Sequence, residues 1–162
     1  MAMSSHLSLT GNTQGAIEGS CDIGGREGTI LVYSMDHLIN IPRDTHTGMP
    51  TGKRIHGSLK VTKEIDKSSP KLFQALCSGE QFSEVLLDYY RISPQGAEES
   101  YYTIKLQNAI IVDIRAWFPE TMVKTNEPFK HMEDVAFSYE KIIWTWVPDG
   151  IEAEDSWSAP KA

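Results

Sequence analysis

Few residues of this sequence have the type and spacing that chemistry requires, and the most suggestive run is residues 48–54. Gly48, Gly52 and Lys53 are the residue types of a phosphate-binding loop, in which backbone amides and a lysine hold a nucleotide's phosphates. The spacing is wrong, because three residues rather than four separate the two glycines. Arg54 also stands where a serine or threonine would bind magnesium. The run therefore predicts no nucleotide site.

The histidines and cysteines show no catalytic or metal-binding spacing either. Cys21 and Cys77 are far apart, which favours two free thiols and leaves a disulfide open. Acidic pairs such as Glu98 and Glu99 are typical of solvated strand ends, although carboxylates can also meet in space. We therefore predict no catalytic residue, no metal and no cofactor, and a protein that is not an enzyme. The histidines form neither an HExxH pair nor a zinc cluster: His6, His37, His46, His56 and His131.

Composition predicts a single globular domain, residues 1–162, of 18.1 kDa. The net charge is −7 and no basic patch occurs, which argues against nucleic acid as a partner. No apolar run approaches the roughly 20 residues that span a bilayer, so we expect no membrane insertion. Residues 1–10 lack the pattern of a secretory signal peptide. We expect a protein made in the cytoplasm, and any export must use a route that needs no such signal.

Alternation of apolar residues predicts long antiparallel strands. Residues 101–116 and 82–92 should form a hairpin, because residues 93–96 (SPQG) have proline and glycine where a turn needs them. Residues 28–41 alternate similarly, while residues 133–147 change face near Glu140, which indicates a bulge or burial on both sides. Shorter strands are predicted at residues 6–10, 16–21 and 54–63. The expected core face of residues 101–116 is Tyr102, Ile104, Leu106, Ile110, Val112 and Ile114, and that of residues 28–41 is Leu31, Tyr33, Met35, Ile39 and Ile41.

One helix is predicted over residues 69–79. Ser69 suits the N-cap, Pro70 the first helical position, and Gly79 the residue past the end. The predicted fold class is mainly β, with a closed or nearly closed antiparallel β-barrel, this short α-helix packed on it, and a long extended loop. The apolar stripe of the helix is Leu72, Phe73, Leu76 and Cys77.

The extended loop, residues 40–53, has neither a helical nor a strand period, and a loop of that length is either functional or disordered. The tryptophans divide between two roles. Trp144 and Trp146 lie on a strand predicted to be buried and are expected in the core. Trp157 lies in a polar tail, so it is the candidate interface anchor.

Residues 54–76 read RIHGSLKVTKEIDKSSPKLFQAL and resemble the Hcp family of the bacterial type VI secretion system. Further runs match in the same order: IEGS at 17–20, REG at 26–28, YYRI at 89–92, LQNA at 106–109, VAFSYEKIIW at 135–144 and DSW at 155–157. Gly57 departs from the family, which often has proline there, and is expected to loosen the base of the extended loop. The residues that carry the first match are His56, Lys63, Glu64, Asp66, Ser68, Ser69, Pro70 and Leu72.

The resemblance implies a β-barrel protomer that closes into a homohexameric ring, with rings stacked into a tube inside a contractile sheath. It also implies a VgrG-type spike at the tip, small effectors in the lumen, and export to the extracellular space or a target cell. Relatives with a toxin domain continue past the barrel, whereas this sequence ends at Ala162, so we expect no enzymatic domain. The loop at about residues 40–54 is expected to contact a neighbouring ring. Its ring-stacking residues are Thr45, His46, Thr47, Gly48, Met49, Pro50 and Thr51.

Two other functions stay open at this stage. One is a monomeric barrel that acts as an enzyme or binds a small ligand in an apolar interior pocket. The other is a free-standing secreted effector or adhesin with the same fold. The sequence does not identify the effectors, the residues that line the lumen, or the stacking orientation of the rings.

Overall fold

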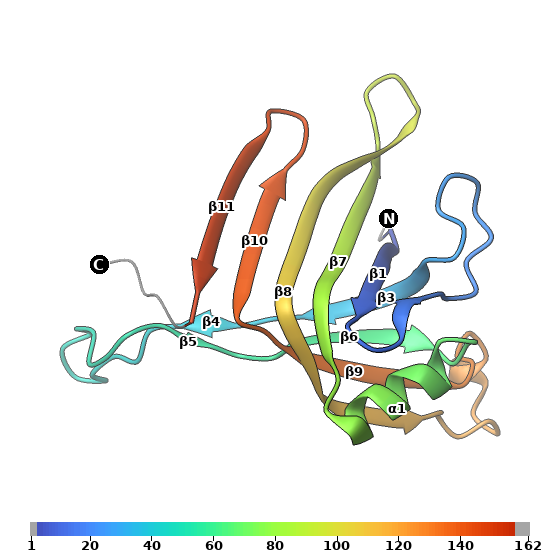
Figure 1. Cartoon of the computed structure of the whole chain (residues 1–162), viewed down its shortest axis with the longest axis horizontal. Coiled ribbons are helices and arrows are strands. Elements are labelled where there is room, and N and C mark those ends of the chain that lie inside the picture. The colour runs from blue at the N-terminus through green and yellow to red at the C-terminus, as the bar shows by residue number, and fades with distance from the viewer. Residues whose placement is uncertain (1–2, 158–162) are drawn as a thin grey trace.

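Six antiparallel strands close into a barrel in the structure, a computed structural model that describes residues 3–157 (Figure 1). The order around the barrel is β8, β7, β1, β3, β6 and β9, and pairing of β9 with β8 closes it. The interior is packed with apolar side chains, among them Leu7, Ile30 and Phe137. The predicted fold class is confirmed. The strand bounds are β1 Ser5–Gly11, β3 Ile30–Asp36, β6 Leu59–Glu64, β7 Gln81–Ile92, β8 Glu98–Trp117 and β9 Met132–Ser138.

The longest strand, β8, serves two sheets. Its second half pairs with β9 in the barrel, and its first half pairs with β10 (Lys141–Trp146), which in turn pairs with β11 (Ile151–Ser156). The upper parts of β7 and β8 therefore rise with β10 and β11 as a sheet that stands clear of the barrel (Figure 1). The predicted strand 133–147 is divided at Tyr139 and Glu140, where a change of face was expected. The predicted turn at residues 93–96 is confirmed by a bond of 2.7 Å from the Ser93 amide to the Ala97 carbonyl oxygen.

The predicted core face of β8 is correct before Asn108 and wrong directly after it. The φ of Asn108 is +51°, in the left-handed region, and the residue interrupts the alternation of the strand. Ile104 and Leu106 are buried before it as predicted, but Ala109 and Ile111 are buried after it. The predicted core residues Ile110 and Val112 instead face outward, and Ile114 packs partly against the core.

The predicted core face of residues 28–41 is also wrong at its start. Both faces are apolar at the start of this segment, so alternation alone could not show which face lies inside. The barrel buries Ile30 and Val32 in place of the predicted Leu31 and Tyr33. Tyr33 is 49% exposed, and a register shift between Val32 and Ser34 returns Met35 to the core side. The segment also divides into β3 and β4 (Ile39–Asn40), which pairs with β5 (Ile55–His56). The predicted strand 54–63 is correspondingly β5 and β6, and the strand at 16–21 is only β2 (Gly15–Ile17).

The helix α1 (Ser69–Ser78) lies where it was predicted and ends at Gly79, whose φ is +69°. The N-cap position is Ser68 rather than Ser69, because Ser69 points into the protein and the Asp66 carboxylate accepts the Ser68 amide at 2.9 Å. Leu72 is buried as expected, and Ala75 completes the buried face, whereas Phe73 and Cys77 are exposed. A short 3₁₀ turn, η1 (Lys124–Asn126), lies in the segment between β8 and β9.

Among the tryptophans, Trp144 packs partly against the core as expected. The core expectation is wrong for Trp146, which lies on the free-standing sheet. There its ring meets Tyr101 edge-on at 5.8 Å, and the Arg91 guanidinium lies 5.2 Å from the ring centre.

Both cysteines are free thiols, as the sequence favoured.

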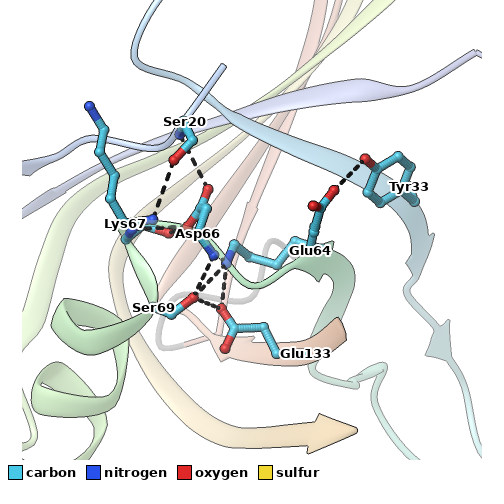
Figure 2. Close-up of polar contacts among 9 residues, drawn as sticks. Ser20, Tyr33, Glu64, Asp66, Lys67, Ser69 and Glu133 are labelled. Carbon is cyan, nitrogen blue, oxygen red and sulfur yellow. Dashed lines mark hydrogen bonds and ion pairs between the residues drawn. The ribbon is translucent and has the colours of Figure 1, made fainter. Parts of the chain in front are cut away.

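A buried ion pair joins β6 to β9 and to the start of α1 (Figure 2). Lys63 and Glu133 oppose each other in the β6–β9 register, and both side chains are 0% exposed. The ammonium group contacts the Glu133 carboxylate, and it lies 3.2 Å from Asp66 Oδ1 and 3.3 Å from Ser69 Oγ. The Ser69 hydroxyl donates to Glu133 Oε1 at 2.8 Å and accepts the Asp66 amide at 3.0 Å.

The loop before α1 is fixed by the same cluster. Burial by itself would raise the pKa of Asp66, but the hydrogen bond from Ser68 and the charge of Lys63 outweigh it and lower that pKa. The Ser20 amide donates to Asp66 Oδ2 at 3.3 Å, and the Lys67 amide donates to the Ser20 hydroxyl at 3.3 Å. Strand pairing, helix start and loop therefore share one set of contacts.

We predict that Lys63→Met destabilises the protein by about 3–5 kcal/mol, because it leaves Glu133 charged, buried and without its counter-ion. The double variant Lys63→Met/Glu133→Leu should recover most of that loss, since both charges are then gone. Urea unfolding at one fixed protein concentration measures both. Lys130→Met, which removes a surface pair with Glu64, is the control and should cost at most about 1 kcal/mol. A double variant as unstable as the single one would show that packing, not the unpaired charge, causes the loss.

Candidate functional site

A long arm, residues 41–54, projects from the barrel between β4 and β5 (Figure 1). Its backbone folds back on itself, with a bridge between Arg43 and Pro50 and a bond of 2.8 Å from the Thr51 amide to the Pro42 carbonyl oxygen. Near the tip, the Asp44 amide donates to the Met49 carbonyl oxygen at 2.9 Å. The arm is thus ordered by bonds within itself.

The tip of the arm also has its own turn. The Gly48 amide donates to the Asp44 carbonyl oxygen at 2.8 Å, and Gly48 has a φ of +72°, which glycine adopts without strain. The Asp44 carboxylate accepts the His46 amide at 2.7 Å. These bonds make the loop a defined hairpin. That it is functional stays a prediction.

The seven residues predicted for ring stacking lie together at this tip, and all are exposed. Their role in stacking stays a prediction. Met49 is 64% exposed, and three more apolar side chains flank the base of the arm without cover from the described part of the chain. Sequence reasoning missed these three, because apolar alternation near residue 40 was read as a core strand. They are Leu38 at 66%, Ile41 at 54% and Ile55 at 51% exposed.

A hydrogen-bonded network holds the base of the arm. Arg54 makes a two-point ion pair with Asp155 on β11, with Nε to Oδ2 at 2.5 Å and Nη2 to Oδ1 at 2.9 Å. His56 Nε2 lies 2.7 Å from the same carboxylate, and His56 Nδ1 lies 2.6 Å from the Tyr139 hydroxyl. That hydroxyl is also 2.9 Å from Nε2 of His37. The network connects both ends of the arm to β11 and to the junction between β9 and β10.

Asp155 only accepts, so His56 Nε2 carries a hydrogen toward it. The Tyr139 hydroxyl has one hydrogen and lies between His56 Nδ1 and His37 Nε2, so it donates to one of these nitrogens and accepts from the other. Burial lowers the pKa of His37, with a further contribution from His56, which favours its neutral form.

The order carboxylate, imidazole, hydroxyl is that of an activated nucleophile, but Tyr139 does not suit this chemistry. Its side chain is buried, at 6% exposed, and burial raises the pKa of its hydroxyl. A nucleophile must reach its substrate and be deprotonated easily, and Tyr139 meets neither condition. Lys63 is likewise fully buried and paired. We conclude that both networks hold structure in place.

Trp157, the candidate interface anchor, lies beside the network. Its ring centre is 5.6 Å from that of His56, its amide donates to the Glu140 carbonyl oxygen at 3.0 Å, and it is 49% exposed.

Gly57 was expected to loosen the base of the arm. Its amide instead donates to the Leu38 carbonyl oxygen at 2.8 Å, a bond across the base that proline cannot make.

Residues 3–157 contain neither a metal-binding cluster nor a membrane-spanning helix. No group of three or more histidine, cysteine, aspartate or glutamate side chains is placed to hold a metal ion. Neither helical segment in that range is long and apolar enough to cross a membrane.

Comparison with known proteins relates this architecture to one family. Residues 6–146 match the family described as "Type VI secretion system effector, Hcp". The chain is 40% identical to the "Major exported protein" of Pseudomonas aeruginosa over 171 aligned residues, which cover 100% of this chain and 99% of that protein.

Two solved structures are similar over nearly the whole chain. The Hcp1 protein of an E. coli pathovar superposes with a TM-score of 0.85 at 36% identity, covering 96% of this chain and 99% of that one. The secreted protein Hcp3 from Pseudomonas aeruginosa gives a TM-score of 0.80 at 34% identity, covering 98% of this chain and 100% of that one.

The network at the base of the arm predicts a measurable shift at Asp155. Its pKa is lowered to about 2, mainly by the hydrogen bonds and charge of Arg54, against about 3.9 in an unfolded chain. A lowered pKa stabilises the fold above the unfolded value, and that stability is lost as the pH falls through about 2. Arg54→Gln should therefore raise the Asp155 pKa toward 3.9 and move the loss to higher pH.

Carboxyl ¹³C titration by NMR measures this pKa directly. Arg43→Gln is the matched control, because it removes a guanidinium from the arm without touching Asp155. Hydrogen exchange of the amides in residues 41–54 reports whether the arm loosens along with the titration. An Asp155 pKa that stays near 2 in Arg54→Gln would contradict the assignment.

Proposed function

The chain belongs to the Hcp family of the type VI secretion system, and from this membership we propose that it assembles into hexameric rings that stack into the secretion tube. In this proposal the tube lies inside a contractile sheath, carries a VgrG-type spike and holds small effectors in its lumen. The protein is made in the cytoplasm and leaves the cell with the tube. Residues 1–162 act as one domain, and its role is structural rather than enzymatic.

The observation that carries the proposal is the exposed arm. A barrel closed by strand pairing has no need of a hairpin that leaves its surface, and this arm presents apolar side chains to water at its tip and base. Exposed apolar surface of this kind marks an interaction site. An arm that reaches out from one end of a protomer suits a head-to-tail contact, which gives rings when the rotation closes and tubes when rings stack.

The free-standing sheet supports the same proposal. On the face that continues from the barrel core, Tyr89, Tyr102 and Trp144 are only half-buried. The opposite face carries charged side chains such as Lys105 and Glu154. An aromatic face left partly open by its own chain is what a neighbouring protomer covers at a ring interface.

The rival functions draw less support. A ligand-binding barrel needs an interior cavity, but here the interior is packed with side chains, and the hollows among the described residues lie at the surface. The name of the Pseudomonas relative, "Major exported protein", is consistent with export. A free-standing effector would share that property, so ring formation is the property that separates it from a tube protein.

The native mass tests the proposal. Six copies of the 18.1 kDa chain give about 109 kDa by light scattering, and negative-stain images of that peak should show rings with an open centre. A monomer at all protein concentrations up to the millimolar range, with no rings in the images, would overturn it.

Deletion of residues 45–51 tests the role of the arm. We predict intact hexamers and weaker stacking, because the tip lies far from the barrel and the free-standing sheet and contributes nothing to the folding of either (Figure 1). Sedimentation velocity separates single rings from stacks. Replacing the same seven residues with a glycine–serine segment of equal length is the matched control, and it should also stack poorly if the side chains matter. Loss of the hexamer in the deletion would contradict the assignment.

A further inference from the structure

The loop of residues 18–29, between β2 and β3, is held to the strands beside it by one arginine. The Arg26 guanidinium lies 4.0 Å from the centre of the Tyr90 ring on β7 and pairs with the Glu98 carboxylate at the start of β8. The Arg26 side chain is only 12% exposed, although the loop itself lies on the surface. Backbone bonds order the loop internally, among them one of 3.0 Å from the Gly28 amide to the Cys21 carbonyl oxygen.

The guanidinium covers a buried histidine of β1. His6 is 2% exposed, with Nε2 at 3.2 Å from Arg26 Nη1 and Nδ1 at 3.0 Å from Thr29 Oγ1. A guanidinium only donates, so His6 Nε2 must accept. The Thr29 hydroxyl donates its hydrogen to the Arg26 carbonyl oxygen at 2.7 Å, so its oxygen accepts the hydrogen on His6 Nδ1. Both partners therefore require a neutral His6 with its hydrogen on Nδ1.

The groups around His6 favour this neutral form. Burial lowers the pKa of His6 and the charge of Arg26 lowers it further, which outweighs the opposite effect of Asp88 and Glu98. The Asp88 carboxylate already accepts the hydroxyl hydrogens of Ser100 and Tyr90. On the other side of β1, the β3 residue opposite His6 is the apolar Leu31. The titratable and charged groups that face His6 come from the loop, β7 and β8: Arg26, Cys21, Asp88, Tyr90 and Glu98.

We propose that protonation of His6 opens the 18–29 loop, so that the loop is closed at neutral pH and released in acid. A proton from solvent takes the lone pair of Nε2, and the Arg26 guanidinium then loses its acceptor and faces a second cation across 3.2 Å. Opening uncovers the half-buried Cys21 thiol, whose sulfur lies 3.8 Å from His6 Nδ1. This device goes beyond the proposed function and does not need ring formation, since all of its groups belong to one protomer.

The direction of the pH dependence follows from the lowered pKa. A histidine whose pKa is lower in the folded protein than in the unfolded chain stabilises the fold above the unfolded value of about 6.5. That contribution is lost as the pH falls from about 6.5 through the lowered value. Acid therefore weakens the contact between His6 and Arg26.

The reactivity of Cys21 measures opening. In a Cys77→Ser background, Cys21 is titrated with 4,4′-dithiodipyridine, a reagent that still attacks thiols in acid. Between about pH 7.5 and about pH 5, we expect its rate to rise about tenfold, the effect of losing one hydrogen bond to a charged group. Rates are expressed relative to those of the Cys21→Ser protein, in which the exposed Cys77 reports how pH affects the reagent itself.

Three variants assign the effect to His6 and Arg26. His6→Gln provides an amide oxygen that accepts from Arg26 but does not titrate, so Cys21 should stay slow at both pH values. Arg26→Gln removes the cation, so Cys21 should react at neutral pH as quickly as the wild type does in acid. His131→Gln, which removes an exposed histidine, is the control and should keep the full acid response.

Hydrogen exchange of the amides in residues 18–29 gives a second measurement on the wild type, which needs no variant to fold. After correction for the intrinsic effect of pH, protection of this loop should fall in acid while that of β8 is kept. An acid response that persists in His6→Gln, or a loop equally protected at both pH values, would overturn the inference and leave the tube proposal intact. Absence of rings in the light-scattering experiment would count against the proposed function and not against this device.

Discussion

A lysine ammonium and a glutamate carboxylate that water cannot reach hold β6 against β9, the strand that closes this barrel by pairing with β8. Lys63 on β6 and Glu133 on β9 are both fully buried, and transfer of two charges out of water costs several kcal/mol for each ion. Their attraction offsets this cost only while the geometry is kept, and Ser69 keeps it by donating to the same carboxylate from the first residue of α1. The register of the last strands, the start of the helix and the loop before it therefore form one unit. The arm follows β4 and returns into β5 and β6, so its placement depends on that unit.

The sequence predicted the elements of the fold better than their faces. The hairpin of β7 and β8, the helix and its terminal glycine follow from local signals, and these were correct. The inner face of β8 could not be predicted beyond Asn108, because its positive φ shifts the alternation at Ala109 to Val112, and a second register shift between Ile111 and Asp113 turns Ile114 back toward the core. The prediction of the buried face failed at the start of β3 for a different reason. Both faces are apolar there, and only closure of the barrel determines that Ile30 and Val32 are inside.

The candidate site was likewise predictable from the sequence only in part. The arm was visible in the sequence as an aperiodic run rich in proline and glycine, and the seven residues predicted for stacking lie together at its tip, where their role stays a prediction. The network at its base was not visible, because His37, His56, Tyr139 and Asp155 come from four separate segments that only the folded chain brings together. Each is unremarkable in its own sequence context, so no local signal marks it. The exposure of Phe118 and Phe129 was missed for a related reason, since both lie in the irregular segment between β8 and β9, where no periodicity distinguishes inside from outside.

The order within the arm has a consequence for the proposed assembly. The arm is held to its own protomer by the Arg54–Asp155 ion pair and the buried His56–Tyr139 contact, so little ordering remains to be done when it binds. A pre-ordered arm loses less conformational entropy on binding than a flexible loop of the same length. A single contact of this kind is weak, but in the proposed hexamer several of them act at once, and their combined effect favours addition of whole rings over addition of single protomers. On this argument rings form first and stack afterwards.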